Sequence, residues 1–133
     1  MIDHLGIEVT DYARSRAFYE RVLATLGHGA VMEVTREMTG HYEGCGFGPP
    51  GRPHFWVGKG RGAPSGGSHI AFSAQSRAQV DAFHAAALAA GARDNGAPGL
   101  RPHYHPNYYG AFAIDPDGHN IEAVCHLPAE AQS

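Results

Sequence analysis

Two histidines and one glutamate in this chain have the residue types of an open metal site: His4, His69 and Glu122. Each histidine begins a segment with a strand pattern, and Glu122 lies in the middle of the closing strand pattern NIEAVC (120–125). A carboxylate buried in such a strand is costly unless it is paired or bound to a metal. Two imidazoles and a carboxylate bind Fe²⁺, Mn²⁺ or Zn²⁺, with Ni²⁺ as a further candidate, and leave positions for a substrate. We therefore expect these three residues to bind one divalent metal ion.

An internal repeat explains how residues so far apart in the chain could meet. HLGIEVTDYARSRAFYERVLATLG, which begins at His4, resembles HIAFSAQSRAQVDAFHAAALAAG, which begins at His69, at an offset of 65 residues. Duplicated modules related by a pseudo-twofold axis would bring their equivalent positions together. Glu122 shifted back by 65 residues falls on Val57, or on Trp56 with a one-residue gap, and neither side chain ligates metals. The repeat therefore predicts three protein ligands rather than four.

Each half of the repeat has the pattern of one strand, one amphipathic helix and three further strands. Asp11 is suited to cap the first helix, and Ser76 and Gln79 are spaced as a capping box for the second. Gly27 and Gly91 are expected to end the two helices. The strands expected after them are AVMEVTRE, HYEGCGFG and HFWVGKG in the first half, then a short segment at 92–95, YYGAFAI and the strand of Glu122. The pattern predicts an α+β fold whose helices cover one face of the sheet.

Four helix residues at matching positions of the repeat are predicted to lie in the core: Phe18, Leu23, Phe83 and Leu88. The chain length of 133 residues suits a single domain. Within it we expect module 1 at about 1–59, a Gly-rich linker at 60–67, module 2 at about 68–126 and a short tail at 127–133.

Composition excludes several classes of function. A hydrophobic content of 43% is typical of a globular domain, and a net charge of −3 provides no basic surface for nucleic acid. No apolar run is long enough to span a membrane, and no signal pattern precedes the first strand. The two cysteines, Cys45 and Cys125, are expected to be reduced thiols in a cytoplasmic protein.

The segment GLRPHYHPNYYGAF (99–112) is the other stretch that could contribute to chemistry. His103, His105 and Tyr109 are candidate catalytic acids or bases beside a substrate. Arg101 could receive an anionic group, or it could be an ordinary solvated residue. The same Pro- and Tyr-rich stretch could instead be a rigid aromatic cover.

The hairpin that precedes Glu122 is expected to turn at DPDG (115–118), which has the residues of a type I turn. We expect His119, directly after the turn glycine, to be exposed. Alternation along the strand places Cys125 on the face opposite to Glu122, and therefore away from a metal.

These motifs resemble the vicinal oxygen chelate superfamily, which includes glyoxalase I, extradiol dioxygenases, fosfomycin-resistance thiol transferases and bleomycin-binding proteins. DHLGIEVTDYARSRAFYERVL is similar to its opening strand and helix, GSHIAFSA to its second-module opening and AIDPDGHNIEAV to its closing hairpin. The resemblance covers about 2–126. It implies two paired βαβββ modules that form a U-shaped mixed sheet around a divalent metal, with the helices outside and His4, His69 and Glu122 at the ligand positions. It also implies a small-molecule substrate and a homodimer, in which modules of two chains can exchange.

Two departures from the family pattern bear on the reaction. Glyoxalase I has a glutamate on the last strand of its first module, where this chain has Trp56, so ordinary glyoxalase I activity is not expected. Fosfomycin-resistance proteins resemble the chain there but have a tyrosine in place of Phe112, and RPHYHPNYY does not resemble their basic loop. Trp56, Arg101 and Phe112 are the expected substrate-binding residues.

The expected function is that of a metal-dependent enzyme acting on a small substrate chelated through adjacent oxygens. The reaction would resemble that of an extradiol dioxygenase or that of a lyase or isomerase. The alternatives are a fosfomycin-type thiol transferase and a non-catalytic protein that binds a drug or another small molecule.

Overall fold

The computed structural model describes residues 1–64 and 66–129 and divides the chain into two compact units, Met1–Gly66 and Gly67–Ser133. Residue 65 of the expected linker and 130–133 of the expected tail lie outside the described residues. No helix among the described residues is long and apolar enough to cross a membrane.

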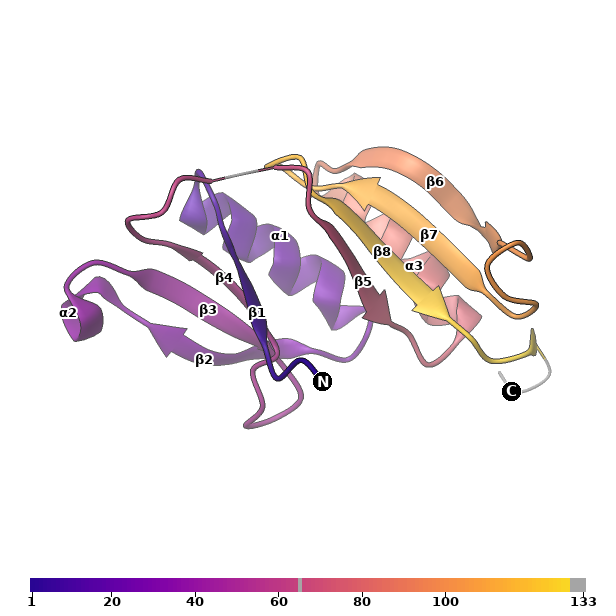
Figure 1. Ribbon diagram of the computed structural model, residues 1–133, viewed down its shortest axis with the longest axis horizontal. Coiled ribbons are helices and arrows are strands. Elements are labelled where there is room, and N and C mark those ends of the chain that lie inside the picture. The colour runs from indigo at the N-terminus through magenta and orange to yellow at the C-terminus, as the bar shows by residue number, and fades with distance from the viewer. Residues whose placement is uncertain (65, 130–133) are drawn as a thin grey trace. The chain divides into compact units, whose positions relative to one another are not determined.

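The first unit is a four-stranded mixed sheet covered on one face by a helix (Figure 1). Its elements are β1 (Leu5–Glu8), α1 (Tyr12–Ala24), β2 (Gly29–Val34), α2 (Arg36–Thr39), β3 (Glu43–Gly48) and β4 (Phe55–Lys59). The strand order is β1-β4-β3-β2, with β1 and β4 parallel and the other neighbours antiparallel. Most residues of β3 and β4 are buried, and α1 contacts both strands from one face of the sheet, so the opposite face is the helix-free face.

The second unit repeats this arrangement without the short helix (Figure 1). Its elements are β5 (His69–Ser73), α3 (Arg77–Ala89), β6 (Arg93–Leu100), β7 (Tyr109–Ile114) and β8 (Asn120–Cys125). The strand order is β5-β8-β7-β6, and β5 and β8 are again parallel. The predicted α+β fold of two βαβββ modules is confirmed.

The helix starts are close to those expected from the capping residues. The Asp11 side chain accepts the backbone N–H of Arg14 at 3.1 Å, and the Ser76 hydroxyl accepts that of Gln79 at 3.1 Å. The Gln79 amide oxygen accepts the backbone N–H of Gln75 rather than that of Ser76. Ser76 therefore caps the second helix as predicted, but the reciprocal hydrogen bond of the capping box is made to Gln75 instead of to Ser76.

Three of the four predicted core residues are buried, and the fourth is not. Phe18, Leu23 and Phe83 are at most 3% exposed, whereas Leu88 is 38% exposed. The buried stripe of α3 ends at Ala87, and Leu88 lies about 100° further around the helix. The repeat predicts a core position at Leu88, but the orientation of α3 places this side chain outside the buried stripe of the helix.

Two expectations about segments of the second unit were also wrong. The segment predicted as a short strand at 92–95 continues as β6 to Leu100, with register irregularities on both sides of Gly96. His119, expected to be exposed, is 1% exposed. The Asp115 carboxylate accepts the backbone N–H groups of Asp117 and His119, both at 2.9 Å, and these bonds fold the turn so that the His119 ring is enclosed. Cys45 and Cys125 are both buried and are not joined in a disulfide.

Candidate metal centre

His69 and Glu122 meet on the helix-free face of the second unit. The parallel pairing of β5 and β8 sets His69 beside Asn120 and Ala71 beside Glu122. The His69 Nε2 atom lies 3.0 Å from a Glu122 carboxylate oxygen. The imidazole side chain is 51% exposed and the carboxylate only 1%, so the pair joins a buried anion to an accessible ring. Two of the three predicted ligands are therefore in contact.

The second ring nitrogen of His69 decides which atom can bind a metal. His69 Nδ1 lies 3.1 Å from the carbonyl oxygen of Asn120. A carbonyl only accepts hydrogen bonds, so Nδ1 carries the proton and the neutral ring has its lone pair at Nε2. That lone pair faces a carboxylate oxygen, and two acceptors at this distance repel each other. A proton carried by Nε2 or by the carboxyl oxygen, or a cation bound by both groups, removes the repulsion. The donor set thus fits a metal ion.

Tyr108 holds the other oxygen of the buried carboxylate. Its hydroxyl donates a hydrogen bond to Glu122 Oε2. Burial, followed by the hydrogen bond to Glu122, raises the pKa of Tyr108 above its ordinary value. Gly110 provides the space for this contact, because a Cβ there would lie 3.0 Å from the Tyr108 ring and 3.2 Å from Glu122 Oε2. Tyr108 therefore orients the carboxylate and keeps its own proton at neutral pH.

His4, the third predicted ligand, belongs to the first unit and directly precedes β1. Its Nδ1 lies 2.6 Å from the carboxylate of Asp3, whose pKa is lowered chiefly by this hydrogen bond. Donation from Nδ1 to a carboxylate leaves Nε2 free to ligate, which is the common arrangement of metal-binding histidines. Within each unit, the described residues contain no group of three or more His, Cys, Asp or Glu side chains that could hold a metal. The complete ligand set thus stays a prediction.

The expected substrate residues Arg101 and Phe112 lie together in the second unit, whereas Tyr109, an expected catalytic acid or base, lies on the other face of its sheet. Phe112 pairs with Glu122 across β7 and β8, and its ring stacks near His69 at 6.2 Å between centroids. The Arg101 guanidinium also lies over this ring, 5.5 Å from its centroid. Tyr109 faces the helix instead, where its hydroxyl donates to Asp81 of α3 at 2.6 Å. Tyr109 is therefore on the face opposite to Glu122.

The expected acids or bases of the loop, His103 and His105, are exposed and lie among aromatic rings. The His103 ring contacts Tyr104 at 4.1 Å, and the His105 ring contacts His126 at 5.5 Å. His126 in turn contacts Tyr108 at 5.2 Å. A row of rings thus connects His105 to the tyrosine that holds Glu122.

Sequence reasoning missed Tyr108 and His126. The signal for Tyr108 was its position two residues before Gly110, because side chains two apart in a strand share a face and a glycine there admits a neighbouring ring. For His126, which follows the closing strand, no spacing in the sequence indicates this contact.

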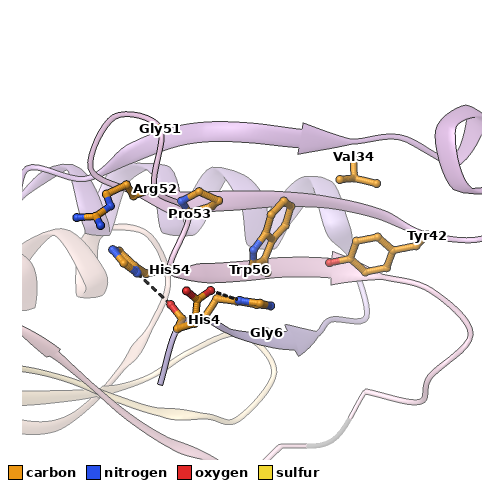
Figure 2. A pocket seen from close by; sticks show the side chains of 10 residues that line it. His4, Gly6, Val34, Tyr42, Gly51, Arg52, Pro53, His54 and Trp56 are labelled. Atoms are coloured by element: carbon orange, nitrogen blue, oxygen red, sulfur yellow. Dashed lines mark hydrogen bonds and ion pairs between the residues drawn. The ribbon is translucent and has the colours of Figure 1, made fainter. Parts of the chain in front are cut away.

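A pocket on the helix-free face of the first unit adjoins His4 (Figure 2). It encloses about 590 Å³, and we call it the Trp56 pocket. Arg52 and His54 lie at one end, and Tyr42 and Val34 at the other, with the Trp56 ring between them (Figure 2). The expected substrate residue Trp56 therefore lines a cavity that also contains a predicted ligand.

The register of the two sheets relates Trp56 to Glu122. Trp56 pairs with Gly6, two residues after His4, and Glu122 pairs with Ala71, two residues after His69. The two residues thus hold equivalent positions in their modules. The one-residue gap is the alignment that the strand pairing selects, and it puts an indole where the other module has a carboxylate.

The chain matches the family model of the Glyoxalase/Bleomycin resistance protein/Dioxygenase superfamily over residues 1–123. The chain belongs to this superfamily. A crystal structure of a glyoxalase/bleomycin resistance protein from Albidiferax ferrireducens is 32% identical, with a TM-score of 0.71 over 92% of this chain and 97% of that one. No curated protein matches the chain.

More distant members of the superfamily share the fold. A glyoxalase/bleomycin resistance protein/dioxygenase family enzyme from Burkholderia phytofirmans is 20% identical, with a TM-score of 0.65 over 95% of this chain and 98% of that one. Glyoxalase I from Zea mays is 19% identical, with a TM-score of 0.69 over 93% of this chain and 45% of that one. At these identities the likeness supports the fold of the glyoxalase superfamily and says nothing of the reaction.

Proposed function

We propose that this superfamily member is a metal-dependent enzyme in which His4, His69 and Glu122 bind one divalent ion. The observation that carries the proposal is the His69–Glu122 contact, in which an imidazole lone pair and a buried carboxylate converge at 3.0 Å. Without a metal, the contact would need a second proton on His69 or a proton on the Glu122 carboxyl. The substrate would be a small molecule that binds through two adjacent oxygens. When bound, the metal would act as a Lewis acid that stabilises negative charge on those oxygens.

The residues around the carboxylate have separable roles in this proposal. Tyr108 orients Glu122 through its hydroxyl, and Gly110 leaves room for that bond. His105 Nδ1 accepts the backbone N–H of Asn107 at 3.1 Å, so the neutral ring carries its proton at Nε2 and can donate it. His105 and the neighbouring His103 are our candidates for moving a proton to or from the substrate. Tyr109, which faces Asp81, is better placed to support α3.

The two substrate-contacting groups proposed for the second unit are Arg101 and Phe112. Arg101 donates to the carbonyl of Ala97 at 2.8 Å and lies over the Phe112 ring, so its guanidinium is held in place. Phe112 forms an apolar wall beside His69. This wall would exclude water from the side of the metal, which strengthens electrostatic interactions with the substrate.

An activity survey tests the proposed enzyme class. Catechols, methylglyoxal–thiol adducts and fosfomycin with a thiol represent extradiol dioxygenase, glyoxalase-like and thiol transferase reactions, and each is assayed with Fe²⁺, Mn²⁺, Zn²⁺ and Ni²⁺. We expect turnover in at least one of these groups that is abolished in Glu122→Gln and retained in His41→Ala, an exposed histidine outside the site. Turnover that persists in Glu122→Gln would contradict the proposal. A metal-free protein that binds ligands without turnover would be the non-catalytic alternative.

We further propose that the protein is a homodimer, and a mixed dimer locates the metal site. His4→Ala and Glu122→Gln chains are co-expressed and the mixed dimer is purified with two affinity tags. If each site takes His4 from one chain and the other two ligands from the partner, one site of the mixed dimer is intact and half of the metal is retained. If each chain builds its own site, both sites are defective and the metal is lost.

A further inference from the structure

We propose that the Trp56 pocket binds a planar aromatic acid, with its ring against the indole of Trp56 and its carboxylate at Arg52. The inference rests on the proposed function, because His4 of the proposed metal site lines the same pocket. It adds the chemical class of the substrate, which neither the metal ligands nor the family membership supplies.

The base of the Trp56 pocket can accommodate flat ligand groups. Glycines occupy the helix-free face of the sheet at Gly44, Gly46 and Gly58, so aromatic side chains lie directly on the backbone. A Cβ on Gly46 would come within 3.0 Å of the Trp56 ring and 2.6 Å of Pro53. Cβ atoms on Gly44 or Gly58 would overlap the Tyr42 ring. Because these glycines have no side chains, the rings of Trp56 and Tyr42 lie close to the backbone of the sheet. The space on the outer side of the two rings is open to a ligand.

The side chains that surround the Trp56 pocket favour an aromatic ligand ring over a saturated one. Trp56 is only partly buried and lies between Pro53 and Tyr42 (Figure 2). An aromatic ligand stacked on the exposed indole gains the interaction of two π systems in addition to burial of apolar surface. The volume of about 590 Å³ lies in the range of small-molecule pockets and exceeds what a metal with its waters would fill.

Charge at one end of the pocket selects an anion. Arg52 is exposed, and among the described residues its guanidinium makes no hydrogen bond or ion pair at contact distance, although its charge acts on the Asp3 carboxylate. Asp3, the acidic residue of the lining, is engaged by His4 at 2.6 Å. Arg52 is thus a planar donor that can bind a carboxylate through two parallel hydrogen bonds. The aromatic floor and this cation together specify an acid with a flat ring.

The single tryptophan of the chain reports on the pocket directly. We would titrate the purified protein, with and without prior chelation of metal, with 2-naphthoate and record Trp56 fluorescence and the heat of binding. 2-Naphthamide has the same ring without the charge, and decahydronaphthalene-2-carboxylate has the charge without the flat ring. We expect saturable quenching by 2-naphthoate and binding of both comparison compounds that is weaker by about tenfold, because each lacks one recognised feature.

Arg52→Gln and Arg21→Gln form the matched pair of variants. Arg21 is an exposed arginine on α1, the helix on the other face of the same sheet. We expect Arg52→Gln to weaken 2-naphthoate binding about tenfold and to leave 2-naphthamide binding unchanged, since the lost interaction is charge-assisted. Arg21→Gln should bind both compounds like the wild type. Equal affinity for the acid and the amide, or unchanged acid binding in Arg52→Gln, would overturn the inference.

The outcomes separate this inference from the proposed function. A protein that holds a divalent metal through the three ligands but does not bind 2-naphthoate would overturn only the substrate class. A protein without metal that binds 2-naphthoate in an Arg52-dependent manner would overturn the proposed metalloenzyme and support the pocket assignment. Circular dichroism of each variant shows whether a loss of binding reflects loss of the fold.

Discussion

Trp56 holds in the first module the strand position that Glu122 holds in the second, since each pairs with the residue two places after its module's opening histidine. One duplicated scaffold thus presents a buried carboxylate at one position and an indole ring at the equivalent one. We infer that the two modules contribute chemically different groups to the proposed site. In the proposed site, the second module would supply the only carboxylate ligand, and at the equivalent position the first would supply the indole of Trp56 to the substrate.

Removing the Tyr108 hydroxyl should weaken metal binding. In Tyr108→Phe the Glu122 carboxylate loses the donor at Oε2, and loss of such an outer partner reduces metal affinity by about tenfold or more. Competition with a fluorescent chelator measures the affinity. Tyr104→Phe, which alters a 61% exposed ring in the same loop, is the control and should bind metal like the wild type. Equal affinities in the two variants would contradict the role of Tyr108.

The absence of a side chain at Gly110 should be as important for metal binding as the Tyr108 hydroxyl, for which it makes room. Gly110→Ala would press a methyl group against Tyr108 and Glu122, and such overpacking costs about 1–3 kcal/mol. We expect a lower free energy of unfolding in urea together with weaker metal binding. Gly29→Ala adds a methyl group to β2 with no atom within 4 Å and should change neither quantity. A Gly110→Ala protein as stable as Gly29→Ala would show that Tyr108 has freedom to move.

The raised pKa of Tyr108 should make stability fall in alkaline solution. In the unfolded chain a tyrosine loses its proton near pH 10, whereas burial and Glu122 keep Tyr108 protonated to higher pH in the folded protein. The unfolded state then binds fewer protons, so the stability contribution is complete below about pH 10 and declines above it. Urea unfolding at about pH 8 and about pH 10.5 should show a smaller decline for Tyr108→Phe than for the wild type. An identical decline would mean that other groups cause it.

The equivalent leucines of the two helices should differ in their contribution to stability. Leu23 is 1% exposed, so Leu23→Ala should lower the free energy of unfolding by about 2–5 kcal/mol. Leu88 is 38% exposed, and Leu88→Ala should cost less than about 1 kcal/mol. Thermal or urea unfolding of the two variants compares them directly. A large loss in Leu88→Ala would indicate that this side chain is buried in solution.

The repeat and the hydrophobic periodicity were sufficient to predict the module architecture, because strand and helix signals agree in both halves. The convergence of His69 and Glu122 was predicted from the repeat and the residue types, and the structure shows that parallel pairing of β5 and β8 sets them side by side. His119 was misjudged, because its burial depends on hydrogen bonds to Asp115 that a turn motif alone does not specify. Tyr108 was missed because Gly110 indicates only space for a neighbouring ring, and the hairpin register is needed to identify Glu122 as its partner.

Metal stoichiometry tests the central claim most directly. The purified protein is loaded with Zn²⁺ or Mn²⁺, freed of excess metal and analysed by inductively coupled plasma mass spectrometry, beside His4→Ala, His69→Ala, Glu122→Gln and the control His41→Ala. We predict one ion per chain in the wild type and in His41→Ala, and loss of the ion in each of the three ligand variants. Metal retained in all three variants, or no bound metal in a folded wild-type protein, would contradict the account.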